Sequence, residues 1–156
     1  DQDIVNFLKS VIEQVEFTNA THWPTGNKIA YAMVGVFGAG SAFPELTRAP
    51  GWRDYAVERA LGNLQDGYLP DDMGIELSPG YHYAFKNYLT IVEIANITEQ
   101  SDPLLQKLVD QCERLFEITA TVATPDRTMP TYQDSGAVRL REQFAQALKY
   151  YPTTRS

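Results

Sequence analysis

The stretch Asp71-Asp72-Met73-Gly74-Ile75-Glu76-Leu77-Ser78-Pro79-Gly80-Tyr81-His82 joins a turn to the start of the best-capped helix in the sequence. Ser78 suits the N-cap position, and Pro79 suits the first helical position, where its missing N–H is not needed. The apolar residues that follow recur at helical spacing, and they are Tyr81, Phe85, Tyr88, Val92 and Ala95. This spacing predicts one amphipathic helix from Ser78 to about Asn96.

The first turn of this helix contains a phenol and an imidazole, at Tyr81 and His82. Free N–H groups at a helix start carry partial positive charge, so we expect Tyr81 to ionise slightly more easily than a phenol in water. The spacing also places Tyr81 on the core side of the helix, where a tyrosine usually packs. Glu76 precedes the helix and is either a ligand contact or an acceptor for unpaired backbone donors.

The rest of the chain shows the same periodicity. Apolar stripes predict further helices at about 3–17, 27–42, 52–64, 102–119 and 138–151, the last one ending at Tyr151-Pro152. No segment alternates with period two for long enough to predict a strand. The expected fold is all-α, with helical hairpins joined by alternately short and long loops that gather at one end.

Length and charge limit the class of protein. The chain has 156 residues, enough for one domain, and a formal net charge of −7. This charge argues against a nucleic-acid partner, because phosphate binding needs clustered Lys and Arg. If such a protein binds an anionic polymer, it needs a local basic or amide-rich site.

Other features exclude or weaken further classes. No apolar run is long enough to cross a bilayer, and the start Asp1-Gln2-Asp3 predicts a processed or excised piece rather than a signal peptide. The lone cysteine, Cys112, is expected to be a small buried hydrophobe. The glycine-rich run 35–42 lacks the small sixth residue of a dinucleotide-binding fingerprint, so its small residues are expected to let helices approach closely. The His and carboxylate spacings predict no metal site, and no cofactor is evident.

A polar connector at residues 18–27 contains His22 and Trp23. Such a composition is typical of a loop that lines a surface cleft, so this connector is the first place to expect ligand contacts.

Four groups of residues, in this order, resemble the helical domain of the heparinase II/III-like polysaccharide lyases, a group that includes alginate lyases. They are Thr25-Gly26-Asn27 with Phe43-Pro44-Glu45-Leu46; Gly51-Trp52; Pro70-Asp71 with Glu76-Leu77-Ser78-Pro79-Gly80-Tyr81-His82; and Pro125-Asp126 with Met129-Pro130 and Asp134-Ser135. The resemblance covers about 19–152, and the string around Tyr81 is its most specific part.

The resemblance implies a fold and an activity. Residues 1–156 would be a single helical domain, part of an incomplete α/α toroid whose partner β-sandwich lies in a missing C-terminal portion of the parent chain. The parent would cleave an acidic, uronic-acid-containing polysaccharide by β-elimination, in the periplasm or after secretion. The isolated chain is expected to be inactive, because it supplies only one wall of the cleft.

The resemblance also implies residue roles. Asn27 matches the amide that neutralises the uronate, although it could equally cap its helix, and Tyr81 matches the general acid, which is also a candidate base. His82 is expected to support Tyr81. Lys28 stands where many alginate-type members have His, which leaves the base open: His22 could replace it, or Lys28 could bind a substrate carboxylate.

Further contacts and two other function classes follow from the same residues. Trp23 and Glu76 are candidate substrate contacts, while Asp134 is expected to orient a helix start. A non-catalytic carbohydrate-binding scaffold would use Trp23, Trp52 and tyrosines as stacking surfaces. A hydrolase would pair two carboxylates, such as Asp72 and Glu76.

Overall fold

The computed structural model describes residues 1–151, and its regular elements are all helices. The elements are α1 (Gln2–Thr21), α2 (Asn27–Ala42), α3 (Ala49–Asp66), α4 (Pro79–His82), the 3₁₀ helix η1 (Tyr83–Lys86), α5 (Asn87–Ile97), α6 (Pro103–Thr121) and α7 (Leu140–Ala147). Within the described residues there is no strand, only the isolated bridges Tyr68–Gly74 and Thr128–Arg139. The all-α prediction is therefore confirmed.

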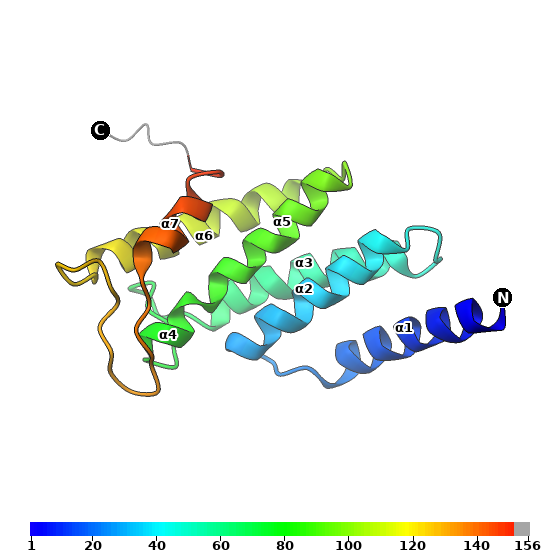
Figure 1. Ribbon diagram of the computed structural model, residues 1–156, viewed down its shortest axis with the longest axis horizontal. Coiled ribbons are helices and arrows are strands. Elements are labelled where there is room, and N and C mark those ends of the chain that lie inside the picture. The colour runs from blue at the N-terminus through cyan, green and yellow to red at the C-terminus, as the bar shows by residue number, and fades with distance from the viewer. Residues whose placement is uncertain (152–156) are drawn as a thin grey trace.

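The helices form antiparallel pairs. In Figure 1, α2 and α3 form one hairpin and α5 and α6 form another, while α1 lies against α2 at the edge and extends away from the rest. Short connections close both hairpins at one end of the molecule. The long segments 67–78 and 122–139 lie at the opposite end, beside α4 and the start of α2. As expected from the loop lengths, the long loops gather at one end.

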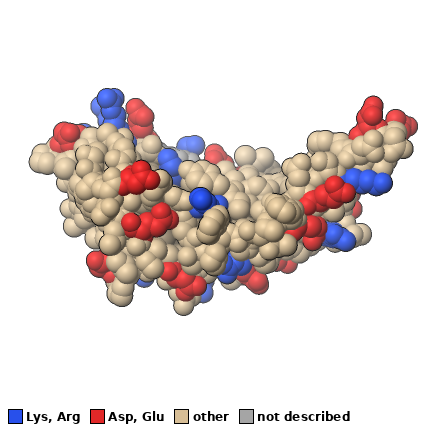
Figure 2. All heavy atoms as spheres, turned by 90° about the horizontal axis from the view of Figure 1, so that it is seen from below, with Lys and Arg blue, Asp and Glu red and all other residues tan. Residues whose placement is uncertain are grey.

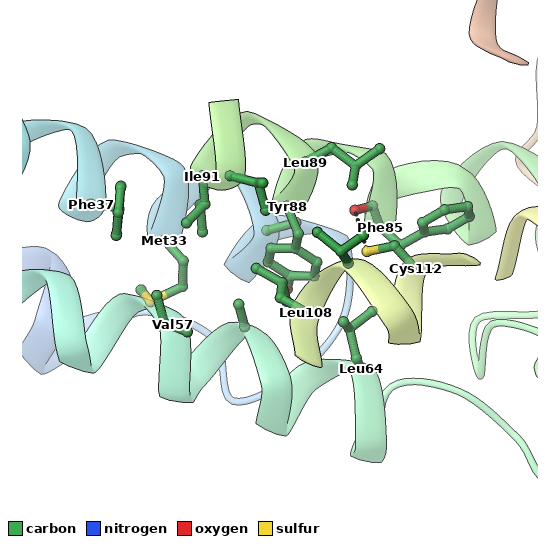
Figure 3. Close-up of a cluster of buried hydrophobic side chains, with 14 of the residues drawn as sticks. Met33, Phe37, Val57, Leu64, Phe85, Tyr88, Leu89, Ile91, Leu108 and Cys112 are labelled. Atoms are coloured by element: carbon green, nitrogen blue, oxygen red, sulfur yellow. Dashed lines mark hydrogen bonds between the residues drawn. The ribbon is translucent and has the colours of Figure 1, made fainter. Parts of the chain in front are cut away.

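The core lies between α2, α3, α5 and α6. Figure 3 shows Tyr88 at its centre, surrounded by Met33 of α2, Leu64 of α3 and Leu108 of α6. Cys112 is fully buried, and its Sγ lies 3.8 Å from the carbonyl oxygen of Phe85. The prediction of a buried Cys112 is confirmed, and its burial raises the pKa of the thiol.

The helix predicted from Ser78 to Asn96 is not continuous. It begins as one turn of α-helix, tightens into η1 at Tyr83–Lys86, and resumes as α5. His82, Tyr83 and Phe85 all enter the core here and make edge-to-face ring contacts. A regular α-helix turns by about 100° per residue and would spread neighbouring side chains around its axis, so we attribute the tighter turn to this aromatic packing.

Other helix boundaries differ from the predicted ones by a few residues. The α1 helix continues to Thr21, beyond the predicted end at Phe17, and the Thr21 hydroxyl donates to the Phe17 carbonyl at 2.7 Å. The α3 helix begins at Ala49, before Pro50, because proline is tolerated in a first turn. Asp102 caps α6, accepting from the Leu104 N–H at 2.8 Å.

Two predicted helix ends differ from the structure. Ser78 occupies the N-cap position, but its hydroxyl donates to the Asp134 carbonyl oxygen rather than capping α4. The last helix covers only Leu140–Ala147, shorter than the predicted 138–151, and its expected stop at Pro152 lies outside the described residues. Among residues 1–151, no helix combines the length and apolar character needed to cross a membrane.

Replacing Leu108 tests the position of the core. Leu108 is fully buried at the contact of α6 with the other core helices. We expect Leu108→Ala to lower the free energy of unfolding by about 2–5 kcal/mol, because it removes buried methyl groups and leaves a cavity. Ile97→Ala, at an exposed helix end, should change it by less than about 0.5 kcal/mol. Urea denaturation measures both, and equal effects would contradict the assigned core.

Candidate functional site

A cavity of about 510 Å³ lies at the end of the molecule where the long loops gather. The lining residues are Asn27, Lys28 and Tyr31 of α2, Gly80 and Tyr81 of α4, Tyr83, Ala84 and Lys86 of η1, residues 137–139 of the long loop, and Glu142 and Gln143 of α7. The amide of Asn27 and the phenol of Tyr81 therefore face one space, although 54 positions separate them in the sequence.

The start of α2 is held by groups from two other segments. Gly26 occupies the N-cap position with φ +94°, and Glu76 Oε1 lies 2.8 Å from where a Cβ would stand, so a larger residue is excluded. Asn63 Oδ1 accepts from the Gly26 N–H at 2.8 Å, and Asn63 Nδ2 donates to the Tyr88 hydroxyl at 2.7 Å. This arrangement fixes the backbone that leads into Asn27.

Asn27 is the first helical residue and not the cap. Its backbone N–H donates to Glu76 Oε1 at 3.0 Å, while its carboxamide makes no hydrogen bond to any residue in 1–151. The carboxamide is thus available to the cavity. Glu76, predicted either as a substrate contact or as an acceptor for backbone donors, serves here as the acceptor at the start of α2.

Tyr81 differs from two expectations. Its side chain is 38% exposed and lines the cavity, so the prediction that it faces the core is wrong. The hydroxyl donates to Asp134 Oδ2 at 2.7 Å. This hydrogen bond and the Asp134 charge raise the pKa of Tyr81 above its ordinary value, so the expectation of easier ionisation is also wrong. The nearby carboxylate outweighs the partial charge of the helix start.

His82 is buried behind the cavity wall. Its Nδ1 accepts from the Gly74 N–H at 3.1 Å, so its Nε2 carries the proton and donates to Thr119 Oγ1 at 3.1 Å. Thr119 in turn donates to the Leu115 carbonyl at 2.6 Å. Burial lowers the pKa of His82 to about 4. The imidazole does not line the cavity beside Tyr81, and it links the turn at Gly74 to α6.

His22 and Trp23, from the polar connector, lie in different environments. His22 hydrogen-bonds the Tyr55 hydroxyl through Nε2 at 2.6 Å and the Trp23 carbonyl through Nδ1 at 2.7 Å, and it does not line the cavity. Trp23 is 60% exposed, and the Lys28 ammonium lies 4.7 Å from the centroid of its ring. The connector thus reaches the cavity through this Trp23–Lys28 contact.

The side chains that line the cavity carry a net positive charge, although the chain as a whole is negatively charged. Lys28, Lys86 and Arg139 line it together with a single acid, Glu142. Lys86 Nζ donates to Gln143 Oε1 at 2.8 Å, and partial burial lowers the pKa of its ammonium. In Figure 2, acidic side chains are spread along the face shown, with basic ones between them rather than in one field. The cavity is therefore a local basic, amide-containing site of the kind that an acidic chain needs for an anionic ligand.

Several residues that line the cavity could not be identified from the sequence. Tyr31 lies on the exposed side of α2, Lys86 lies in the unpredicted η1, and Arg139 ends a long loop. None of them stands in a motif that points to chemistry. Asp134 was identified only within a motif, as a residue that orients a helix start, and its carboxylate instead accepts from Tyr81.

Two further candidate roles can be examined in the structure. Trp52 is 3% exposed and its indole N–H donates to Glu16 Oε1, so it cannot serve as a sugar-stacking surface. Residues 1–151 contain no group of three or more His, Cys, Asp or Glu side chains placed to hold a metal ion.

Comparison with known proteins identifies relatives of this chain. Residues 1–156 match the family described as heparinase II/III N-terminus. The heparin-sulfate lyase of Pedobacter heparinus is 25% identical over 163 residues, covering 96% of this chain and 25% of the relative. Among solved structures, heparinase III aligns with a TM-score of 0.83 at 20% identity, covering 96% of this chain and 25% of that one. Heparan sulfate lyase HepC from Pedobacter heparinus aligns with a TM-score of 0.69 at 25% identity, covering 96% and 24%. The chain spans about a quarter of the length of these relatives.

The buried imidazole of His82 predicts a pH dependence of stability. Its pKa falls from 6.5 in the unfolded chain to about 4 in the folded one. Between pH 6.5 and 4, His82 is therefore protonated in the unfolded chain but not in the folded chain. The free energy of unfolding falls as the pH drops through this range. The loss should approach about 1.4 kcal/mol per pH unit, and about 3 kcal/mol in total.

Urea midpoints between pH 4 and 7 measure this loss, and His82→Gln should flatten the profile. His22→Gln, in the partly exposed connector, is the matched control and should retain the wild-type slope. An unchanged slope in His82→Gln would contradict the assignment.

The Asn63 side chain gives a second prediction for this site. Asn63→Ala leaves the Gly26 N–H and the buried Tyr88 hydroxyl without partners. We expect a loss of about 2–4 kcal/mol in the free energy of unfolding, because each unpaired buried group costs about 1–3 kcal/mol. Asn96→Ala, at an exposed position of α5, should cost less than about 0.5 kcal/mol. Thermal or urea unfolding compares the two variants, and equal losses would exclude a special role for Asn63.

Proposed function

The chain belongs to the heparinase II/III N-terminus family, and from this premise we propose that it is the helical part of a polysaccharide lyase. The observation that carries the proposal is the cavity that Asn27 and Tyr81 share with three cationic side chains. The proposed substrate is an acidic, uronic-acid-containing polysaccharide. The names of the relatives make heparin and heparan sulfate the first polymers to test, with alginate next.

The proposed reaction is β-elimination. A base removes the proton on C5 of the uronate, the C4–oxygen bond breaks, a C4–C5 double bond forms, and an acid protonates the leaving glycosidic oxygen. The negative charge of the uronate opposes the first step, because removal of the C5 proton adds charge next to the carboxylate. Donors aimed at the carboxylate lower this barrier. The Asn27 carboxamide, with no partner in residues 1–151, fits this role, and the Lys28 ammonium fits a neighbouring contact with a substrate anion.

Tyr81 is assigned the role of general acid. An acid must be protonated before it acts, and the Asp134 hydrogen bond raises the pKa of Tyr81, which favours the protonated phenol. His22 does not line the cavity, so we do not assign it the role of base. His82 is assigned a positioning role. Its buried imidazole hydrogen-bonds Gly74, in the turn before α4, and Thr119 of α6.

The rest of the parent protein completes the proposal. We place residues 1–156 in an incomplete α/α toroid, with a β-sandwich from the remaining sequence supplying the second wall of the cleft. Because polymers of this kind lie outside the cytoplasm, the periplasm or the extracellular space is the proposed location. The isolated chain should be inactive for want of the second wall.

Substitution of the two cavity residues tests the function. In the full-length protein that contains this chain, we expect Tyr81→Phe to lower kcat by about 10²- to 10⁴-fold, because the acid is lost. Asn27→Ala should lower it by about 10²- to 10³-fold. The measurement is the absorbance of the unsaturated uronate product. Tyr132→Phe removes an exposed hydroxyl outside the cavity and is the matched control.

The same variants separate a lyase from a non-catalytic scaffold. Calorimetric titration with uronate oligomers that shows wild-type binding in Asn27→Ala and Tyr81→Phe, with no product from the parent protein, would favour the scaffold. Wild-type turnover in Tyr81→Phe would remove Tyr81 from the mechanism.

A further inference from the structure

The loop 122–139, between α6 and α7, is hydrogen-bonded to the start of α4 through two adjacent loop residues, Asp134 and Ser135. The Ser78 hydroxyl donates to the Asp134 carbonyl oxygen at 3.1 Å, and the Gly80 N–H donates to Ser135 Oγ at 2.7 Å. The Tyr81 hydroxyl donates to Asp134 Oδ2 at 2.7 Å. A Cβ on Gly80 would lie 3.0 Å from Ser135 Oγ, so the glycine permits this close approach. Asp134 and Ser135 thus lie on the turn that presents Tyr81.

The loop is also anchored away from Tyr81. Met129 is buried, and its N–H donates to the Val138 carbonyl at 3.0 Å. The Leu140 N–H donates to the Arg127 carbonyl at 3.0 Å, so both sides of the loop are tied together at its base. Gln133, directly before Asp134, adopts φ +57°, a left-handed conformation that a glutamine rarely takes. The backbone therefore carries a local conformational cost directly before the residue whose carboxylate contacts Tyr81.

We propose that Asp134 is a positioning residue for the reaction, whose carboxylate holds the Tyr81 phenol oxygen in place at the cavity wall while Ser135 fixes the backbone beneath it. This inference rests on the proposed function, because it specifies how the general acid is held. An exposed tyrosine ring moves about its side-chain torsions, and an accepting carboxylate limits that motion. When the leaving glycosidic oxygen is in place, the O–H turns about the C–O bond from Asp134 toward it and delivers the proton. Only the protonated phenol can donate, so the same contact selects the acid form.

The charges around Tyr81 make Asp134 the group to test. Glu76 also faces Tyr81, and Lys28, Lys86, Arg139 and Glu142 line the cavity from the other segments. Asp134 is the largest contributor to the raised pKa of Tyr81, through its hydrogen bond and then its charge. Asp134→Asn removes the charge and keeps the size of the side chain, so it should let Tyr81 ionise at lower pH.

The first measurement follows the ionisation of Tyr81 itself. In the full-length protein labelled with ¹³C at tyrosine Cζ, the Tyr81 signal is assigned by its loss in Tyr81→Phe. We expect Asp134→Asn to shift the titration of this signal to lower pH. Asp126→Asn is the matched control, since Asp126 lies in the same loop and accepts from Thr124 and Thr128 without touching Tyr81. An unchanged titration in Asp134→Asn, or an equal shift in Asp126→Asn, overturns the inference.

The second measurement is the pH profile of kcat/KM on the cleaved polysaccharide. Asp134→Asn should move the alkaline limb to lower pH and lower kcat by about 10- to 100-fold, because a loosely held phenol ring spends less time in the reactive position. Asp134→Glu, which restores a carboxylate, should recover part of the shift. If Tyr81→Phe abolishes activity while Asp134→Asn keeps the wild-type profile, the role of Asp134 is overturned and the proposed function stands. If Tyr81→Phe retains wild-type turnover, Tyr81 is removed from the mechanism, and the role of Asp134 in the reaction fails with it. If the full-length protein cleaves no uronate polymer, the proposed function itself fails.

Discussion

The functional end of the molecule depends on the buried side chain of Asn63. Its oxygen accepts the Gly26 N–H and its amide group donates to the Tyr88 hydroxyl, so one side chain of α3 ties the start of α2 to the first turn of α5. A buried backbone N–H at a helix start has no partner within its own helix and must find one elsewhere. Because Asn63 supplies that partner, the chain can enter α2 through the left-handed Gly26 and present Asn27 to the cavity.

The two ends of the helical pairs have different physical tasks. The short turns at one end only reverse the chain, and the packed helices between them provide a rigid frame. At the other end, the long segments 67–78 and 122–139 carry residues that no regular helix could bring together. Glu76 from the first segment accepts from the start of α2, and Asp134 from the second accepts from Tyr81. The rigid helices position the loops, and the loops then position the side chains that line the cavity.

The sequence predicted the helices because their apolar periodicity is a local property. It did not predict the tightening at Tyr83–Lys86, since that depends on rings from Tyr68 and Phe116 that pack there in the fold. For the site, Asn27 and Tyr81 could be named from motif resemblance, and both line the cavity. The environment of Tyr81 could not be predicted, because the helix start is local whereas Asp134 lies 53 positions away and has the larger effect on its ionisation.

The net charge of the chain limits the classes of ligand that it can bind, but it does not say where a ligand would bind. A net charge of −7 means that the chain as a whole repels an anionic polymer at long range. At contact distance the balance is different, because Lys28, Lys86 and Arg139 come from three separate segments and meet around one cavity. Salt screens the long-range repulsion within about 10 Å, whereas groups in a partly enclosed cavity are screened less. An anionic chain would therefore be held mainly where the cations converge, beside Asn27 and Tyr81, so the acidic surface itself favours binding in a single place.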